Sequence, residues 1–362
     1  MSVAITIQHA RKAYDSHLVI PDISLTVQKG EFFTLLGPSG CGKTTLLKMI
    51  AGFTAFDAGS CSFNDTKIND VDPAKRNIGM VFQNAALFPH LNVRQNVAFG
   101  LKTRGFSKAY ITDRTEHVLK LMHLDHTADQ LPDKLSGGQQ QRAALARALC
   151  IEPDVLLMDE PLSHLDAKLR VEMRTLIKNM QRTLKITTIY VTHDQEEAMA
   201  ISDRIAVMQN GSLRQAGSPQ AIYQRPANTF VASFIGHSNI LTADLAMQHG
   251  KAYISLFNHT LPAPALKPAY RKEQPILVSI RPEQLYIQAK EDTSLHAVVE
   301  DSTFLGLNTN YTVRLENGMH LESVQRSSTE RIIAAGTEVS LAVDTENINL
   351  FTACGETNIC AY

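Results

Sequence analysis

The chain has 362 residues, which is long for one domain and predicts two or three. Its 35 lysine and arginine residues balance 36 acidic ones, so no basic stripe for nucleic acid is expected. The first residues lack the basic segment and apolar run of a secretory signal, and no apolar stretch of about 18 residues could span a bilayer. We therefore expect a soluble cytosolic protein whose membrane role comes through a partner.

From residue 3 to residue 35 the chain alternates apolar and polar residues in short runs, which predicts an antiparallel strand region. It leads into GPSGCGKT at Gly37 to Thr44, which fits the pattern G-x-x-x-x-G-K-[ST]. In such a loop backbone N–H groups face the β-phosphate, Lys43 reaches the β and γ oxygens, and the Thr44 hydroxyl binds magnesium. Residues 43–52 then have helical spacing and end at a glycine, as a phosphate-binding loop requires.

The five cysteines are scattered and odd in number, so free thiols are expected. Cys41 lies inside the phosphate loop, next to a helix N-terminus that is expected to lower its pKa. Cys354 and Cys360 are close in sequence, but no neighbouring histidine or second pair completes a metal site. Their roles stay open.

Gln83 directly follows the strand-like run IGMVF. From Asn84 to about Cys150 the sequence has several separate segments with helical spacing. This pattern predicts a helical subdomain inserted between strands. The subdomain contains LSGGQ at Leu135 to Gln139, at the start of a helix. Free N–H groups and the positive end of the helix dipole would face an anion there.

Two buried strands are predicted beyond the helical insert. Val155 to Met158 is wholly apolar, as in a parallel strand covered on both faces, and it ends in Asp159 and Glu160. Asp159 is expected to hold magnesium, and Glu160 to take a proton from an attacking water. The alternative is that the paired acids cap the following helix. ITTIYVTH repeats the strand pattern and ends in His193. A histidine at the end of a strand is more often structural, so its role is not decided by this pattern alone.

Near Gly236 the sequence changes to short β-like runs such as ILVSI, HAVVE, NYTVRL and EVSLAV, separated by proline, glycine and asparagine. A small all-β domain of barrel type is predicted from about residue 240 to the end.

The phosphate loop, Gln83, LSGGQ, VLLMDE and His193, in this order, resemble the ATP-binding subunit of an ABC transporter. SIRPEQLYI and FLGLNTNYTVRL resemble the C-terminal OB-like domain of the importer subfamily with the maltose, polyamine and ferric-iron ATPases. The resemblance implies an α/β P-loop ABC ATPase domain at 1–236, with a helical subdomain at about 84–150. A small all-β OB-like regulatory domain at 237–362 would follow.

The resemblance also implies roles for single residues. VFQNAALFPHLNV is similar to the Q-loop, in which Gln83 reaches the magnesium or its water; a lone glutamine would otherwise be a surface residue. His193 would contact the γ-phosphate. Tyr14 would stack on adenine, with core packing as its alternative. LSGGQ would act on the γ-phosphate of the opposite subunit, as would Asp166 in a D-loop where His164 departs from the usual small residue or asparagine.

The implied catalytic residues are Glu160, His193, Lys43 and Gln83. The implied nucleotide contacts are Tyr14, Gly37, Pro38, Ser39, Gly40, Cys41, Gly42, Lys43, Thr44, Thr45, Gln83, Ser136, Gly137, Gly138, Gln139 and Asp166. The implied metal ligands are Thr44, Gln83 and Asp159.

By this resemblance the chain hydrolyses ATP with Mg²⁺ and couples it to import at the cytoplasmic face of the cell membrane. Its expected partners are a second copy in a head-to-tail ATP sandwich, integral membrane permease subunits and, indirectly, a periplasmic or lipid-anchored solute-binding protein. A non-transport ABC ATPase would carry long coiled coils or two fused cassettes, and an exporter ATPase usually lacks such a β domain. Motifs such as residues 217–236 are shared by iron, polyamine, sugar, sulfate and phosphonate importers, so they do not identify the cargo. Ferric iron and polyamine are the leading cargo hypotheses, on general likeness only.

Overall fold

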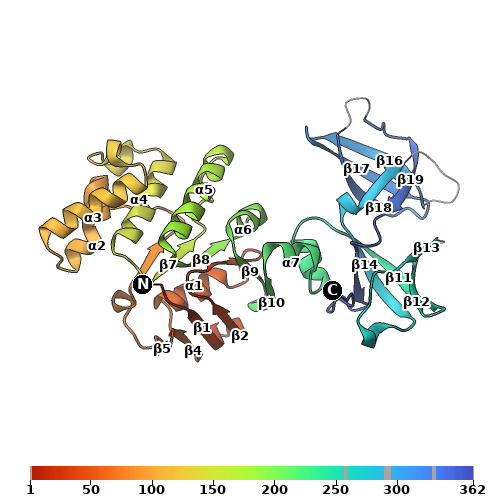
Figure 1. Cartoon of the computed structure of the whole chain (residues 1–362), viewed down its shortest axis with the longest axis horizontal. Coiled ribbons are helices and arrows are strands. Elements are labelled where there is room, and N and C mark those ends of the chain that lie inside the picture. The colour runs from red at the N-terminus through yellow and green to blue at the C-terminus, as the bar shows by residue number, and fades with distance from the viewer. Residues whose placement is uncertain (1, 257–258, 289–294, 328–331, 362) are drawn as a thin grey trace. The chain divides into compact units, whose positions relative to one another are not determined.

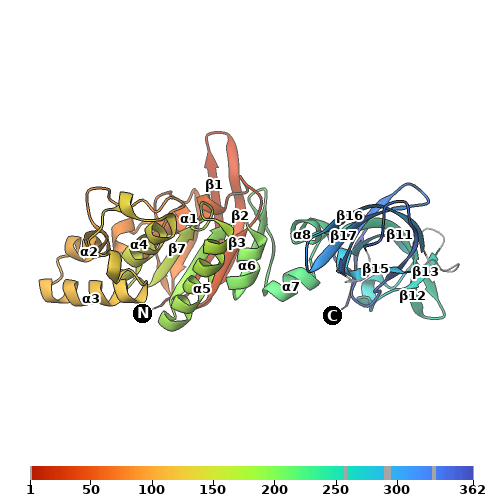
Figure 2. The same ribbon diagram turned by 90° about the horizontal axis from the view of Figure 1, so that it is seen from above.

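The computed structural model describes residues 2–256, 259–288, 295–327 and 332–361. The chain forms two compact units, Met1–Pro219 and Gln220–Tyr362. Figures 1 and 2 show the elements of each unit from two directions. In the described ranges, no helix is both long enough and apolar enough to cross a membrane.

A mostly parallel sheet forms the centre of the first unit (Figure 1), with strand order β10-β9-β3-β8-β7-β6. Only β10 runs antiparallel to its neighbour among these described strands. The two predicted buried strands are confirmed as the parallel strands β7 and β8, whose apolar runs are covered on both faces. The strands are β3 (Phe32–Leu36), β6 (Ile78–Val81), β7 (Val155–Asp159), β8 (Thr187–Thr192), β9 (Arg204–Gln209) and β10 (Ser212–Gly217).

A second, antiparallel sheet has the order β2-β1-β4-β5. It confirms the predicted antiparallel start, except that residues 32–36 pair in parallel with β8 and β9. The sequence of a short apolar run does not indicate which strand it pairs with or in which direction. The parallel pairing of residues 32–36 could therefore not be predicted from the sequence pattern. Its strands are β1 (Ile5–Tyr14), β2 (His17–Val27), β4 (Ala58–Phe63) and β5 (Thr66–Lys67).

Helices cover the central sheet. One core packs α1 and the antiparallel sheet against strands β3, β7 and β8, and a second packs α2 to α5 around Phe32, Met158 and Tyr190. The predicted helical insert is confirmed as α2, α3 and α4 (Figure 1). The helices are α1 (Lys43–Ala51), α2 (Val93–Thr103), α3 (Lys108–Leu121), α4 (Gly137–Cys150), α5 (Ala167–Leu184) and α6 (Gln195–Ile201), with short 3₁₀ helices η1 (Pro73–Lys75), η2 (Asp125–Thr127) and η3 (Pro132–Lys134).

The second unit is built from two five-stranded antiparallel sheets around one core. Their orders are β13-β12-β11-β14-β20 and β15-β19-β16-β17-β18, so the predicted all-β region is present. The strands are β11 (Asn239–Gln248), β12 (Lys251–Leu256), β13 (His259–Pro262), β14 (Gln274–Ile280), β15 (Leu285–Gln288), β16 (Leu295–Phe304), β17 (Asn308–Leu315), β18 (His320–Arg326), β19 (Glu338–Val343) and β20 (Asn349–Thr352). The 3₁₀ helices are η4 (Pro268–Tyr270) and η5 (Pro282–Gln284).

Two short helices, α7 (Pro219–Gln224) and α8 (Thr229–Phe234), lie at the start of the second unit. The guanidinium of Arg281, a residue only 3% exposed, donates to the carbonyls of Tyr223, Ile235 and His237 and stacks on the Tyr223 ring at 3.7 Å. These contacts explain why the compact units divide at residue 219, whereas the sequence placed the domain boundary at 236.

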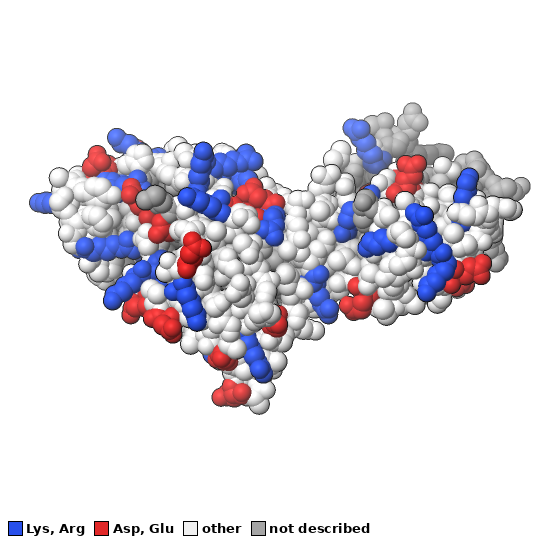
Figure 3. Space-filling view, turned by 60° about the horizontal axis from the view of Figure 1, so that its bottom comes forward, with Lys and Arg blue, Asp and Glu red and all other residues white. Residues whose placement is uncertain are grey.

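The charged side chains are mixed in sign on the face drawn in Figure 3, where Asp and Glu are interspersed among Lys and Arg. This pattern matches the near-zero net charge of the chain. The five cysteines are free thiols, as expected.

Candidate functional site

The predicted site residues follow four neighbouring parallel strands where these strands end. The phosphate loop, 37–44, follows β3, and Gln83 follows β6. Asp159 ends β7, and His193 follows β8. The register pairs Val81 with Met158, Asp159 with Val191, and Leu36 with Thr192, so all four ends meet at one edge of the sheet. Ligands of open α/β sheets bind at this carboxyl edge.

The glycines of the phosphate loop are required by its geometry. Gly40 and Gly42 have φ angles of +78° and +97°, which side chains other than glycine rarely adopt. A Cβ at Gly37 would lie 2.4 Å from the carbonyl oxygen of Met208. The loop ends at the first turn of α1, whose backbone N–H groups and helix dipole favour an anion.

Lys43 is buried within this loop. Its Nζ donates to the carbonyl oxygens of Gly37 and Pro38, each at 2.8 Å. The loop thus carries a fixed cation beside its N–H groups, which suits a polyphosphate. Cys41 lies beside it, with Sγ 3.8 Å from that Nζ. Burial raises the pKa of Cys41 more than the Lys43 charge lowers it, so the expected lowering of this pKa was wrong.

Two oxygen ligands of the type that Mg²⁺ prefers lie together beside the loop. The Thr44 hydroxyl donates to Asp159 Oδ1 at 2.8 Å. Burial raises the pKa of Asp159, the Thr44 bond opposes this rise, and the neighbouring Glu160 charge adds to it. A cation at this position would offset the cost of burying the carboxylate, so the pair fits the expected metal. Gln83 is exposed on the segment after β6, along the same edge.

Glu160 is held in an unusual backbone conformation at the centre of the edge. Its φ of +44° is left-handed, which is strained for glutamate, and its N–H donates to Val191 O at 2.9 Å. Its Oε2 lies 3.0 Å from His193 Nδ1. The hydroxyl of Ser163 donates to the Glu160 carbonyl at 3.0 Å. The site therefore joins a carboxylate and an imidazole, the usual pair for moving a proton.

The alternative that Asp159 and Glu160 cap the next helix is not supported by the geometry. The N-cap of α5 is Asp166, whose carboxylate accepts from the N–H of Leu169 at 2.9 Å. Asp159 instead bonds Thr44, and Glu160 contacts His193.

Tyr14 ends β1 with its side chain on the surface. The residue is 46% exposed, so core packing does not account for it, and adenine stacking stays a prediction. Lys12 lies two residues earlier on the same strand face, with Nζ 5.4 Å from the Tyr14 ring centroid. Asp57 accepts from Lys12 Nζ at 2.6 Å and from the N–H of Ala13 at 2.7 Å. Neither Lys12 nor Asp57 was predicted from the sequence. The spacing of two residues between Lys12 and Tyr14 on a strand could have indicated that the two side chains share a face.

LSGGQ forms the start of α4 in the helical subdomain. Ser136 is the N-cap and forms a capping box with Gln139. Ser136 and Gly137 are exposed, whereas a Cβ at Gly138 would lie 2.6 Å from the Leu169 side chain. The N–H of Leu135 donates to Pro132 O in η3, and Leu165 and Leu169 lie next to Gly137 and Gly138. The predicted action of LSGGQ on the phosphate of a second copy stays a prediction.

Two domain families match the chain: residues 20–163 match the ABC transporter family, and residues 278–351 match the TOBE domain. The Fe(3+) ions import ATP-binding protein FbpC of Fusobacterium nucleatum is 55% identical over 99% of this chain and 96% of that protein. The spermidine/putrescine import ATP-binding protein PotA of Thermotoga maritima is 41% identical over 87% of this chain and 87% of that protein.

Solved structures match the first part of the chain. One is CbiO1 from Clostridium perfringens, part of the ABC transporter complex CbiONQ, with a TM-score of 0.57 and 29% identity over 61% of this chain and 91% of that one. Another is the ATP-binding cassette MJ0796, dimeric and bound to ADP and Pi in a post-hydrolysis state. It has a TM-score of 0.54 and 30% identity over 59% of this chain and 98% of that one.

Proposed function

This chain belongs to the ATP-binding subunits of ABC importers, which hydrolyse ATP to drive uptake, and on that premise we propose that Mg-ATP binds at the carboxyl edge of its central sheet. The matching families and solved structures confirm the resemblance found in the motifs and the predicted fold class. The observation that carries the proposal is the contact of Thr44 with Asp159 next to that of Glu160 with His193. It places metal ligands and an acid–base pair beside one phosphate loop.

In this proposal each side chain has one task. Thr44 and Asp159 hold Mg²⁺, which neutralises phosphate charge when bound, and Gln83 reaches the metal or its water. Lys43 leaves its loop carbonyls for the β and γ oxygens. Glu160 accepts the proton of the attacking water. With a proton on each ring nitrogen, His193 would donate through Nδ1 to Glu160 and through Nε2 to the γ-phosphate.

We propose further that two copies of the chain share two nucleotides. LSGGQ supports this, because its helix start at Ser136 and Gly137 is exposed. The D-loop residue Asp166 is exposed beside it. The dimeric state of the MJ0796 structure is consistent with this arrangement.

The membrane subunits are proposed to bind the helical subdomain, which would hold the chain at the cytoplasmic face of the membrane. Between α2 and α3 there is a pocket of about 440 Å³ lined by Ala98, Phe106 and Ile111 among basic residues. Phe106 and Tyr110 are exposed and stack with ring centroids 5.1 Å apart. An apolar patch of this kind in a water-soluble subdomain favours a protein partner.

Ferric iron is the proposed cargo. The named iron-import relative is 55% identical to this chain, against 41% for the named polyamine-import relative. Cells without the gene should lose uptake of radiolabelled Fe(III) and keep uptake of radiolabelled spermidine. The reverse result would assign the chain to polyamine import.

Glu160→Gln tests the assignment of the base. The amide keeps the size of the side chain but cannot accept the proton, so hydrolysis should fall by about 10²–10⁴-fold while Mg-ATP still binds. With both nucleotides trapped, the variant should run as a dimer on size-exclusion chromatography in Mg-ATP and as a smaller species without it.

Ser136→Arg in the Glu160→Gln background tests the shared site. A bulky side chain at the start of LSGGQ should abolish the ATP-induced dimer. A dimer that forms in spite of this change would refute the placement of LSGGQ at the opposite nucleotide, and full hydrolysis by Glu160→Gln would refute the base.

A further inference from the structure

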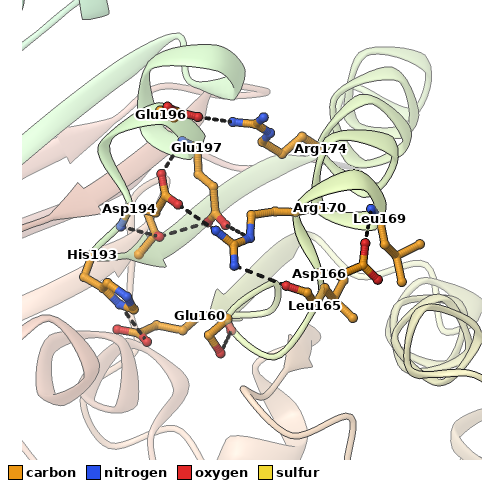
Figure 4. A network of polar contacts seen from close by, with 12 residues as sticks. Glu160, Leu165, Asp166, Leu169, Arg170, Arg174, His193, Asp194, Glu196 and Glu197 are labelled. Atoms are coloured by element: carbon orange, nitrogen blue, oxygen red, sulfur yellow. Dashed lines mark hydrogen bonds and ion pairs between the residues drawn. The ribbon is translucent and has the colours of Figure 1, made fainter. Parts of the chain in front are cut away.

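Arg170, in the first turn of α5, contacts three groups that come from different parts of the chain (Figure 4). Its Nη2 donates to the carbonyl oxygen of Leu165 at 3.2 Å. Its Nη1 donates to Asp194 Oδ2, also at 3.2 Å. Its Nε lies 3.6 Å from Glu197 Oε1. The planar guanidinium thus donates two hydrogen bonds and turns its Nε toward the Glu197 carboxylate, an arrangement that a single ammonium group could not make.

Two of these acceptors belong to the loops that carry the acid–base pair. Leu165 lies in the loop 160–166, which begins at Glu160 and leads into α5. Asp194 directly follows His193 and is the N-cap of α6, accepting from the N–H of Glu197 at 3.0 Å. Arg170 therefore links the loop after β7 with the loop after β8. These loops bring Glu160 Oε2 and His193 Nδ1 to 3.0 Å (Figure 4).

The third contact of Arg170 is an ion pair with Glu197 in the protein interior. The Glu197 side chain is only 4% exposed. Its Oε2 accepts from the hydroxyls of Tyr190 at 2.8 Å and Thr192 at 2.9 Å, both on β8. The other oxygen faces Arg170, so the arginine is fixed to the strand that ends at His193.

We propose that Arg170 is a positioning residue for ATP hydrolysis, which holds the loops 160–166 and 193–194 together so that Glu160 and His193 keep their contact. The inference rests on the proposed role of Glu160. Arg170 touches neither side chain of the pair. Its effect comes through the backbone of Leu165 and the carboxylate of Asp194, and a shift of about 1 Å in such a pair is sufficient to cost about 10²-fold in rate.

The competing explanation is that Arg170 only neutralises the buried Glu197 carboxylate. Removal of one partner of a buried pair leaves an uncompensated charge, which destabilises a protein wherever the pair lies. This explanation predicts a loss of folding stability that disappears when Glu197 becomes neutral. It predicts no separate effect on the chemical step.

The experiment compares Arg170→Met with Arg174→Met in the full chain. Arg174 is the matched control, because it lies one turn further along α5 and, within the described residues, forms an ion pair only with the exposed Glu196, at 3.9 Å. Arg170→Met should lower kcat for Mg-ATP at least about tenfold, with KM and binding of a fluorescent ATP analogue changed less than about twofold. Arg174→Met should keep the parent kcat within about twofold.

The double variant Arg170→Met/Glu197→Gln separates the two explanations, with Glu197→Gln as its reference. The neutral amide should restore the melting temperature lost in Arg170→Met, while kcat should stay low. Arg170→Lys keeps the positive charge but cannot bond Leu165 O and Asp194 Oδ2 while it faces Glu197, so its kcat should stay below half of the parent value.

Recovery of kcat in the double variant, or full kcat in Arg170→Lys, would overturn the proposal, because charge alone would then suffice. Glu160→Gln is measured in parallel. If Glu160→Gln is fully active, the proposed base is wrong whatever Arg170 does. If Glu160→Gln is inactive and Arg170→Met is fully active, only the inference about Arg170 fails.

Discussion

At the scale of single residues, burial decides how the thiols differ. Burial raises the pKa of Cys61 to about 12, and the residue is fully covered. Cys354 is exposed, and hydrogen bonds from the Thr352 hydroxyl and from nearby backbone N–H groups lower its pKa. Because the thiolate is the reactive form, the structure ranks these cysteines by both access and ionisation.

Cys354 should therefore react first with a thiol reagent such as DTNB. In the folded chain one thiol should react fast, and this phase should persist to lower pH than that of a free cysteine, since a lowered pKa keeps more thiolate present as pH falls. Cys61 should react only in denaturant. Cys354→Ser should remove the fast phase; a fast phase that persists in this variant would contradict the ranking.

At the scale of elements, the segment after β6 that carries Gln83 is irregular but firmly held. The buried Asn96 on α2 donates through Nδ2 to the carbonyls of Phe88, Leu91 and Asn92, and its Oδ1 accepts from the N–H of Phe88 at 2.8 Å. From α4, Arg147 donates to the carbonyls of Ala85 and Ala86. The segment is thus tied to two helices of the helical subdomain, on which the membrane subunits are proposed to bind.

Asn96→Ala should loosen this segment. The variant removes the amide from the part-buried N–H of Phe88 and carbonyl of Leu91, and an unsatisfied group of this kind costs about 1–3 kcal/mol of unfolding free energy when it is buried. Urea unfolding should show a lower midpoint than the parent chain. The control is Lys102→Ala, an exposed residue on the same helix. Equal midpoints for the two variants would show that the amide does not hold the segment.

Features that depend on neighbouring residues in the sequence could be predicted, whereas features that depend on contacts between distant residues could not. The phosphate loop, LSGGQ and the strand before Asp159 were predictable, since glycine spacing, helix starts and apolar runs are local patterns. The bridge made by Arg170 was not, because it joins residues up to 27 positions apart through side-chain geometry. The pKa of Cys41 was missed for a related reason: the helix N-terminus is visible in the sequence, whereas the degree of burial is not.

At the scale of the whole molecule, residues 220–236 decide where the second unit begins. Besides the contacts of Arg281, the side chain of Asn358 donates to Pro226 O at 2.7 Å, and its N–H donates to Ala227 O at 2.9 Å. Both Arg281 and Asn358 are buried in the second unit. The composition of the chain changes near residue 236, but these hydrogen bonds place the preceding helices in the same folding unit.

Two fragments of the chain test this division. Residues 220–362 should unfold cooperatively on heating, because they retain every acceptor of Arg281. Residues 237–362 lose the carbonyls of Tyr223 and Ile235 and the ring that stacks on the guanidinium, so they should be less stable by about 3 kcal/mol or more. Circular dichroism melts of the two fragments measure the difference. Arg281→Met in the longer fragment should reproduce part of the loss, since it removes the same hydrogen bonds without shortening the chain. If the shorter fragment melts at the same temperature as the longer one, the folding unit begins at 237, where the sequence placed the boundary.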